Sequence, residues 1–274
     1  MQEENTSSTL QYILLGFTVT IATLVLLFLM LSLSAPRFAG ALMFAVTGSD
    51  RATLIASRGN SDVYVDLGSQ YFGGAQPYNV LLAKEYFEKA ISRDAENYLA
   101  HYQLARVLFV LNDIEGAKEH IDTSTALVPD FSRNYYMQGL IYGFAQEYEK
   151  AEAGFKEFIT RQPNLWAGYV DLSWIYFAQG KFTEGRELLE PIVDMFPNNP
   201  WVANSYGLFL MHSHQFAEAS EQFDIALAAL GAMMPDDFGI AYPGNDPAYY
   251  EEGYEQMRTS IEHNIATLVQ LTSQ

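Results

Sequence analysis

Two histidines, His212 and His214, are the residues of this sequence whose type and spacing first suggest chemistry. Imidazole nitrogens are common zinc ligands, so a His-x-His pair could hold a metal ion. Residues two apart on a helix do not face one another, however, and a periodic pattern described below places His214 in a turn. The spacing therefore argues against a metal site, and we predict neither a metal nor any other cofactor.

Catalytic motifs are likewise absent from the sequence. The tripeptide Asp237-Phe238-Gly239 matches one found in protein kinases, but neither a glycine-rich loop nor a catalytic loop accompanies it. No Gly-x-Ser-x-Gly or His-Glu-x-x-His motif occurs, and the absence of cysteine excludes a thiol nucleophile, a disulfide framework and a thiolate metal site. We therefore predict that the protein is not an enzyme and that its function depends on binding.

The charge balance excludes one class of partner. The 274 residues include 33 acidic and 15 basic side chains, which gives a net charge of −18. Nucleic-acid binding needs a basic stripe along one face, and the sequence contains no such stripe. The acidic surface is interpreted as a source of solubility, with docking of basic partners as the alternative.

A small residue returns every thirty-four residues through the middle of the chain. Four residues after each of these positions stands a large apolar residue, so each pair lies on one face of a helix. Helix breakers and a second series of small residues keep the same period, which indicates repeated pairs of helices. The small positions are Ala83, Ala117, Ala151, Gly185 and Ala219, and the large positions are Phe87, Ile121, Phe155, Leu189 and Phe223.

The first helix of each pair carries a signature of its own. One copy reads Tyr135-x2-Gln138-Gly139-x2-Tyr142, and two other copies share its spacing. Together with the small, aromatic and proline positions of the second helix, this pattern resembles the tetratricopeptide repeat. The resemblance covers residues 61–231 and implies an all-α, right-handed superhelical solenoid of about five helix-turn-helix repeats.

The resemblance also implies where a partner would bind. In this family, certain positions of the first helices line the inner, concave surface. Mapped onto this sequence, those positions hold mainly aromatic and arginine side chains, which are enriched at interface anchors. The candidate binding residues are Tyr102, Arg106, Phe109, Arg133, Tyr136, Trp174, Phe177, Trp201 and Asn204. We expect the aromatics to anchor an extended or helical peptide and the arginines to pair with its carboxylates; packing between helices is the alternative for Trp174 and Phe177.

An uncharged stretch near the N-terminus is long enough to span a membrane. Residues 12–33 contain no charged side chain, and about twenty such residues cross a bilayer as a helix. A cleaved secretory signal would have a basic region before a shorter apolar core, so an uncleaved single-pass anchor is favoured. Residues 1–11 are expected to form a polar tail, and residues 34–60 a stalk or interfacial segment.

Two features of the sequence give opposite indications about the side of the membrane on which the repeats lie. Arg37 and Arg51 follow the span while the tail has no basic residue, which favours a cytoplasmic location. The layout of a short tail, one anchor and then repeats resembles that of bacterial envelope proteins, whose repeats lie outside the cytoplasm. Because long domains translocate largely regardless of charge, we adopt the extracytoplasmic side as the expectation.

The repeat period ends at Gly231. Residues 232–246 are rich in turn-forming residues and are predicted to form a long loop, itself a secondary candidate for a contact site. Residues 247–274 are predicted to form a helix that starts from an Asp246 cap and Pro247. Its apolar stripe is expected to cover the open end of the last repeat.

These observations predict a membrane-anchored scaffold that binds a protein partner through its concave groove. The alternative is a non-catalytic accessory subunit of a membrane complex, such as one for envelope polysaccharide synthesis or protein export, that uses residues 12–33 as its contact. Small and polar residues in that segment, including Gly16 and Thr20, suit helix packing in lipid. A hydrolase built on paired carboxylates is a third class. The sequence makes no prediction about the partner's identity or the oligomeric state.

Overall fold

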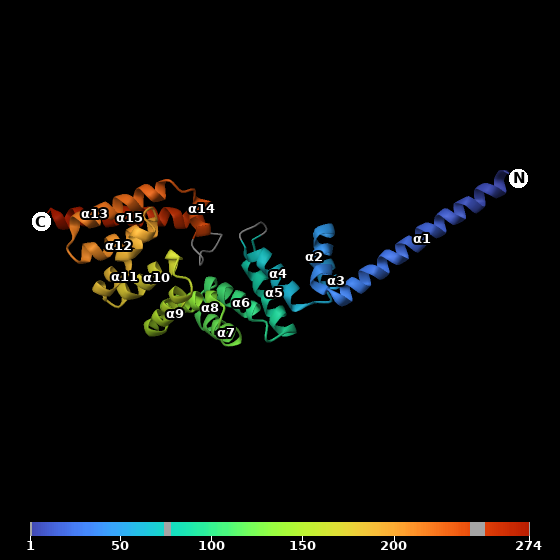
Figure 1. Ribbon diagram of the computed structural model, residues 1–274, viewed down its shortest axis with the longest axis horizontal. Coiled ribbons are helices and arrows are strands. Elements are labelled where there is room, and N and C mark those ends of the chain that lie inside the picture. Colours follow the sequence, from blue (N-terminus) through green and yellow to red (C-terminus); the bar gives the residue numbers. More distant parts are fainter. Residues whose placement is uncertain (1, 74–77, 242–249, 274) are drawn as a thin grey trace.

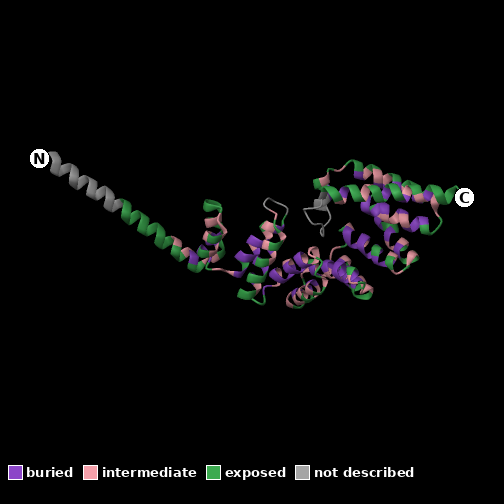
Figure 2. Cartoon of the chain, turned by 180° about the vertical axis from the view of Figure 1, so that it is seen from behind, coloured by how far each residue is buried: buried purple, intermediate pink, exposed green. Residues whose placement is uncertain are grey.

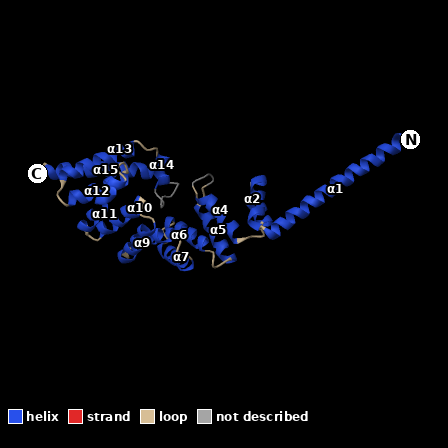
Figure 3. Ribbon diagram, in the orientation of Figure 1, coloured by secondary structure: helices blue, strands red, loops and turns tan. Residues whose placement is uncertain are grey.

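The computed structural model describes residues 2–73, 78–241 and 250–273, and this part of the chain contains helices and no strand (Figure 3). The helices form an elongated array in which one long N-terminal helix protrudes at one end and the C-terminal helices close the other (Figure 1). The prediction of an all-α repeat solenoid with a C-terminal capping helix and one apolar N-terminal helix is confirmed.

The helices before and within the repeats have the following bounds. The N-terminal helices are α1 (Gln2–Ser34), α2 (Pro36–Thr47) and α3 (Asp50–Ala56). The ten repeat helices are α4 (Ser61–Phe72), α5 (Val80–Arg93), α6 (Tyr98–Val110), α7 (Ile114–Leu127), α8 (Ser132–Phe144), α9 (Tyr148–Arg161), α10 (Trp166–Ala178), α11 (Phe182–Met195), α12 (Pro200–His212) and α13 (Phe216–Gly231). They are followed by α14 (Pro235–Ala241) and α15 (Tyr250–Thr272).

Each repeat is a pair of packed helices, and in three of the repeats a glycine of the first helix meets an aromatic ring of the second. In the pair α8 and α9, a Cβ atom added to Gly139 would lie 2.6 Å from the ring of Phe155, which is fully buried. Gly207 has the same relation to Phe223 in the pair α12 and α13. The glycines therefore let two helix backbones approach closely enough for the ring to fill the space between them.

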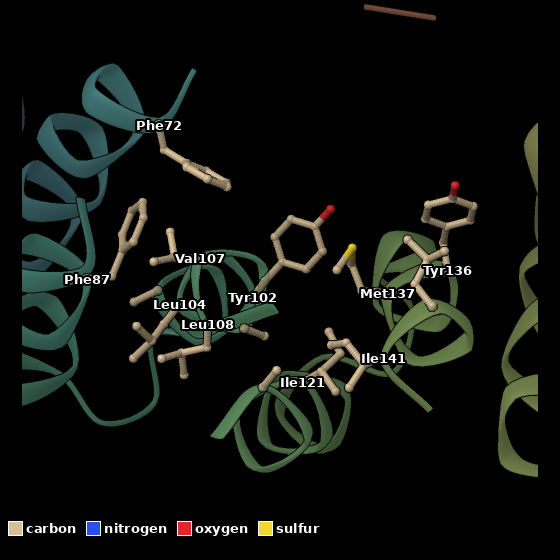
Figure 4. Packing of buried hydrophobic residues seen from close by; sticks show 14 of the residues in the cluster. Phe72, Phe87, Tyr102, Leu104, Val107, Leu108, Ile121, Tyr136, Met137 and Ile141 are labelled. Atoms are coloured by element: carbon tan, nitrogen blue, oxygen red, sulfur yellow. The ribbon is translucent and has the colours of Figure 1, made fainter. Parts of the chain in front are cut away.

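The buried hydrophobic residues form two clusters that adjoin at α10 and together run through the array of repeats. The buried residues in Figure 2 follow the inner sides of the paired helices, whereas α1 is exposed along most of the part whose side chains are described, up to its last turn. One cluster extends from α4 to α10, and the other extends from α10 to α15. Figure 4 shows the first of these around α6, α7 and α8, where Leu104 lies on the side of Phe87 and Ile121 of α7 lies beside Ile141 of α8. The core is therefore continuous from repeat to repeat, as expected for a solenoid.

The turns inside four of the repeats share one backbone conformation. Asn112, Gln146, Gly180 and His214 occupy equivalent positions and have φ values of 60°, 60°, 72° and 60°. A residue with a side chain is strained in this left-handed region, and glycine is not. The turn expected at His214 is confirmed, so this residue does not share a helix face with His212.

Gly180 and Gln146 give a matched pair of predictions for stability. Gly180→Ala is expected to lower the free energy of unfolding by about 1 kcal/mol, because alanine is strained at positive φ and an added Cβ would touch nothing within 4 Å. Gln146→Gly is expected to raise it by about 0.5–1 kcal/mol, because the strain is removed. Urea denaturation followed by circular dichroism measures both. Effects of the same sign in the two variants would contradict the view that this left-handed turn position favours glycine.

Helix α1 contains the described segment whose length and composition would allow it to cross a membrane. The eighteen residues Phe17–Ser34 have a mean hydropathy of 2.3, and only 6% of them are buried. The helix begins at Gln2, so residues 2–11 of the predicted polar tail belong to the helix rather than standing apart from it. Helix α1 protrudes from the rest of the array, so most of this segment has no other helix beside it (Figure 1).

The segment predicted as a stalk folds into two short helices, α2 and α3, that pack on each other and on α4. Pro36 starts α2, Gly48 at φ 61° ends it, and the Ser49 side chain caps α3 by accepting a hydrogen bond from the Ala52 amide. The hydroxyl of Ser32 donates to the carbonyl oxygen of Ala56, which joins the last turn of α1 to the end of α3.

The C-terminal segment differs from the prediction in one respect. A seven-residue helix, α14, lies within the segment expected to be a loop, and its Phe238 is buried. Helix α15 packs against α13 and α14, where the Tyr254 hydroxyl donates to the carbonyl oxygen of Leu230 at 3.1 Å. The predicted cap at Asp246 and Pro247 lies outside the described residues.

Candidate functional site

A cavity of about 460 Å³ lies on the inner side of α6 and α8, bordered by the end of α9. It brings together four of the nine predicted binding residues, namely Tyr102, Arg106, Arg133 and Tyr136. We call this cavity the groove pocket. Its other lining residues are Ser132, Phe158, Gln162 and Leu165.

The two arginines of the groove pocket have no carboxylate partner among the described residues. Arg106 donates to the side-chain oxygen of Gln103 at 2.9 Å, and its guanidinium carbon lies 4.9 Å from the ring centre of Phe72. Arg133 is exposed. Every lysine of the chain, by contrast, forms an ion pair with a carboxylate. The lining contains no acidic residue, so the groove pocket is a positively charged site on an acidic protein.

The two tyrosines form the apolar wall of the groove pocket. Figure 4 shows that the hydroxyls of Tyr102 and Tyr136 point to the same side, away from Ile121 of α7. The Tyr136 hydroxyl donates to Asp171 Oδ2 at 2.7 Å, which links α8 to α10. Burial raises the pKa of the Tyr102 phenol, while the nearby Arg106 and Arg133 act in the opposite direction. Both tyrosines are buried, and they form well-packed platforms for a partner.

Phe109 and Trp174 belong to a partly exposed row of aromatic residues that crosses three repeats. The ring of Phe109 meets that of Phe144 edge-on, with ring centres 5.0 Å apart. The ring centres of Phe144 and Trp174 are 5.4 Å apart. Phe144 is 59% exposed and Trp174 is 38% exposed. Because Arg106 and Phe109 are three residues apart on α6, this row shares a helix face with the groove pocket. We call Phe109, Phe144 and Trp174 the aromatic row.

The remaining predicted residues lie in a different environment. Phe177 is half-buried against Phe182 and His212. Trp201 is 8% exposed and is sandwiched between Trp166 and Phe238, at 4.6 and 4.7 Å. These contacts come from the protein's own packing.

Asn204 is also occupied within the protein. Its side-chain oxygen accepts a hydrogen bond from Asn264 of α15 at 2.9 Å, and both residues are buried. Helices α14 and α15 therefore cover the part of the groove that repeat five would otherwise offer.

Sequence reasoning missed Phe144, Phe158 and Leu165. Phe144 is the last residue of α8 and lies outside the positions that the family pattern assigns to the concave surface. Phe158 and Leu165 belong to the second helix of the repeat and to the connection after it. An apolar residue at the end of a helix or in a connection between repeats is the signal that could have identified Phe144 and Leu165, whereas Phe158 is a buried residue of α9 that this signal does not mark.

The described residues contain no group of three histidine, cysteine or acidic side chains placed to hold a metal ion. His212 instead stacks on Phe182, with ring centres 4.3 Å apart and nearly parallel planes. Burial lowers the pKa of His212, and His214 contributes in the same direction.

A second histidine pair, His101 and His120, joins the two helices of repeat two. Their Nδ1 atoms are 2.9 Å apart, and His101 Nε2 lies 3.1 Å from the carbonyl oxygen of Ala95. Donation to Ala95 leaves His101 Nδ1 as an acceptor, so His120 Nδ1 is the donor. Burial, followed by the neighbouring His101, lowers the pKa of His120. The folded state therefore favours neutral His120.

Acidification through about pH 6.5 is expected to lower the free energy of unfolding, because the unfolded state then binds a proton that folded His120 resists. His120→Asn retains an amide donor for His101 but cannot titrate, so it is expected to reduce this loss. Urea denaturation at about pH 7.5 and 5.5 measures the difference. The exposed His263 provides the control His263→Asn. An unchanged pH dependence in His120→Asn would contradict the assignment.

Comparison with family models identifies the repeats. Models described as tetratricopeptide repeat match residues 80–139 and 136–200. Cell division cycle protein 27 homolog B from Arabidopsis thaliana is 31% identical over 102 residues, which is 34% of this chain and 14% of that protein. The chain thus spans about a seventh of the length of this curated relative.

Solved structures share the fold at low sequence identity. A structure of MamA from residue 41 to its end, from Desulfovibrio magneticus RS-1, has a TM-score of 0.56 and 17% identity, with 63% of this chain and 96% of that solved chain covered. PilF from Pseudomonas aeruginosa has a TM-score of 0.56 and 21% identity, with 76% of this chain and 91% of PilF covered. PilW, a type IV pilus biogenesis factor, has a TM-score of 0.56 and 17% identity, with coverages of 76% and 98%.

Proposed function

The chain belongs to the tetratricopeptide repeat family, whose repeats are interaction scaffolds, and from this premise we propose that it binds an acidic segment of a protein partner. The segment lies across the groove pocket and the aromatic row. Its carboxylates pair with Arg106 and Arg133, and its apolar side chains pack on the aromatic rings. The scaffold acts at a membrane to which α1 anchors it.

The observation that carries this proposal is the pair of arginines without internal counterions. Leaving a solvated guanidinium without a counterion costs little free energy. A protein with a net charge of −18 nevertheless offers many carboxylates that could pair with it. All the lysines are neutralised in this way, and these two arginines are not. Their planar guanidinium groups are suited to bidentate binding of carboxylates. An external acidic ligand is the partner that this chemistry selects.

Arg106→Gln combined with Arg133→Gln is expected to weaken partner binding by about a hundredfold, since two charge-assisted hydrogen bonds of about 1.5 kcal/mol each are lost. The partner is captured from detergent-solubilised membranes with the wild-type chain, identified, and then titrated against both forms by calorimetry. Lys84→Gln combined with Lys150→Gln removes the same charge from the second helices α5 and α9, away from the groove pocket, and serves as the control.

The outcome separates specific pairing from a general charge effect. Binding that falls only in the arginine variant supports the groove pocket as the contact site. Equal affinity of wild type and arginine variant would refute the proposal, provided that circular dichroism shows the variant to be folded. A binding loss that is the same in the lysine control would indicate a nonspecific effect of net charge.

The membrane part of the proposal rests on the exposed apolar surface of Phe17–Ser34. Alkaline extraction of membranes tests anchoring, and the mass of the extracted chain distinguishes an anchor from a cleaved signal. Protease protection of intact cells tests the proposed extracytoplasmic location. Replacement of residues 12–33 with an unrelated membrane helix separates the two functional hypotheses: function is retained if α1 is only an anchor and lost if it is the contact of an accessory subunit.

A further inference from the structure

Three arginines gather around a second cavity at the end of the solenoid closest to α1. This cavity has a volume of about 570 Å³ and lies between α3 and α5. Arg51 belongs to α3, Arg58 follows it, and Arg93 is in the last turn of α5. Among the described residues none of the three pairs with a carboxylate, whereas the fourth basic lining residue, Lys89, pairs with Glu85 at 2.5 Å. We call this cavity the basic pocket.

The carboxylate that lines the basic pocket is already engaged by neutral donors. Asp50 Oδ2 accepts hydrogen bonds from the hydroxyls of Tyr71 and Tyr86 at 2.7 and 2.6 Å. These bonds hold Asp50 at the start of α3, where it also complements the helix dipole. Asp50 thus serves a structural role and forms no ion pair with Arg51, Arg58 or Arg93. The positive charge of the basic pocket is left for an external anion.

The backbone at Arg58 is strained in a way that glycine would relieve. Arg58 has a φ of 57° and is followed by Gly59 with a φ of 63°. The Gly59 amide donates to the carbonyl oxygen of Leu54, which closes the end of α3. Glycine is the favoured residue at such a position because it has no Cβ. The chain instead carries a long guanidinium side chain there, and strain of this kind is concentrated at functional sites.

The basic pocket lies close to the end of the apolar helix. The hydroxyl of Ser32, in the last turn of α1, bonds to the carbonyl oxygen of Ala56, and Arg58 follows Ala56 by two residues. When Phe17–Ser34 fills the hydrocarbon layer, which is about 30 Å thick, Arg58 lies at the level of the lipid headgroups. Ile55, also in the lining, is 71% exposed and adds an apolar surface beside the charges.

We propose that the basic pocket binds the phosphate of an anionic phospholipid headgroup. Arginine donates two parallel hydrogen bonds to phosphate oxygens, and three arginines without counterions favour a lipid with net negative charge over a zwitterionic one. Such a contact fixes the first repeat at the membrane surface and sets the orientation of the groove pocket relative to the bilayer. The inference rests on the proposed anchoring by α1.

The test uses the full chain in a non-ionic detergent and measures lipid binding by native mass spectrometry. Dioctanoyl phosphatidylglycerol is expected to bind saturably, and dioctanoyl phosphatidylcholine and inorganic phosphate are expected to bind at least about tenfold more weakly. Arg58→Gly is expected to reduce phosphatidylglycerol affinity by about tenfold while relieving backbone strain, so the loss cannot be attributed to unfolding. Arg51→Gln combined with Arg93→Gln is expected to abolish saturable binding.

Three results would overturn the proposal. The first is equal phosphatidylglycerol affinity in wild type and Arg58→Gly. The second is an equal loss in the control Lys84→Gln, Lys150→Gln, which would show a general charge effect. The third is inorganic phosphate binding with the same affinity as the lipid, which would identify a site for free phosphate.

Alkaline extraction of membranes, done alongside the lipid-binding measurement, separates this proposal from the anchoring on which it rests. Alkaline extraction of membranes reports only on α1, because Arg58→Gly leaves the apolar helix unchanged. A chain that is extracted but still shows Arg58-dependent lipid binding would refute anchoring and retain the site. A chain that stays in membranes but shows no Arg58-dependent binding would refute the site and retain anchoring.

Discussion

Phe155→Ala is expected to lower the free energy of unfolding by about 3–5 kcal/mol, because it removes a fully buried aromatic ring from the contact between two helices. The Phe155 ring is fully buried and occupies the space above Gly139, where a Cβ atom would lie 2.6 Å away. It also meets the ring of Tyr136 edge-on at 5.8 Å. Alanine would leave a cavity that the helices cannot close, because the backbones of α8 and α9 are already in contact at Gly154 and Gly139.

Urea denaturation followed by circular dichroism measures this loss. Phe144→Ala is the matched control, because Phe144 belongs to α8 and is 59% exposed, so its removal is expected to cost no more than about 1 kcal/mol. Equal losses in the two variants would contradict the view that the contact between Gly139 and Phe155 holds α8 and α9 together. Since Tyr136 also lines the groove pocket, Phe155→Ala is further expected to weaken partner binding.

The repeats could be predicted from sequence because their geometry is periodic. The small position of Ala151 and the large position of Phe155 recur every thirty-four residues. Because the two positions are four residues apart, they lie on the same helix face. The buried series from Phe87 to Phe223 follows that period without exception, since every member is fully buried. Local rules also gave the turn at His214. Such predictions succeed because the same contact is made again in each repeat.

The groove was predicted less completely, because family positions specify a helix face but not what covers it. Tyr102, Arg106, Arg133 and Tyr136 line one cavity, in agreement with their shared face. Trp201 has an equivalent position in the repeat pattern, yet α14 covers it. The residues of α14 lie outside the repeat period and among turn-forming residues, so neither periodicity nor turn chemistry predicts a helix there.

The pair α2 and α3 shows a similar limit. Pro36 and Gly48 mark the start and end of α2 clearly in the sequence, but the contact between Ser32 and Ala56 depends on how the two short helices fold back onto α1. No periodic pattern contains that information. The basic pocket depends on the same tertiary arrangement, because Arg58 and Arg93 are separated by the whole first repeat in sequence. Contacts made once in a fold are therefore the ones that sequence patterns miss.

Phe238→Ala is expected to lower the free energy of unfolding by about 3 kcal/mol and to expose Trp201. Phe238 is 4% exposed, stacks on Trp201 at 4.7 Å and meets Tyr254 edge-on at 5.7 Å. It is thus the contact through which α14 closes the last repeat. Its removal is expected to shift tryptophan emission to longer wavelength, since Trp201 is one of only three tryptophans in the chain.

Met234→Ala is the control for this prediction, because Met234 immediately precedes α14 and is 67% exposed. Urea denaturation followed by tryptophan fluorescence measures stability and exposure in the same experiment. If Phe238→Ala leaves the emission unchanged, α14 does not cover Trp201 in solution. In that case Trp201 and Asn204 return to the partner-binding surface, and the proposed acidic segment would extend from the groove pocket to repeat five. A large emission shift would instead confine the partner to α6, α8 and α10, where Arg106 and Arg133 supply the charge.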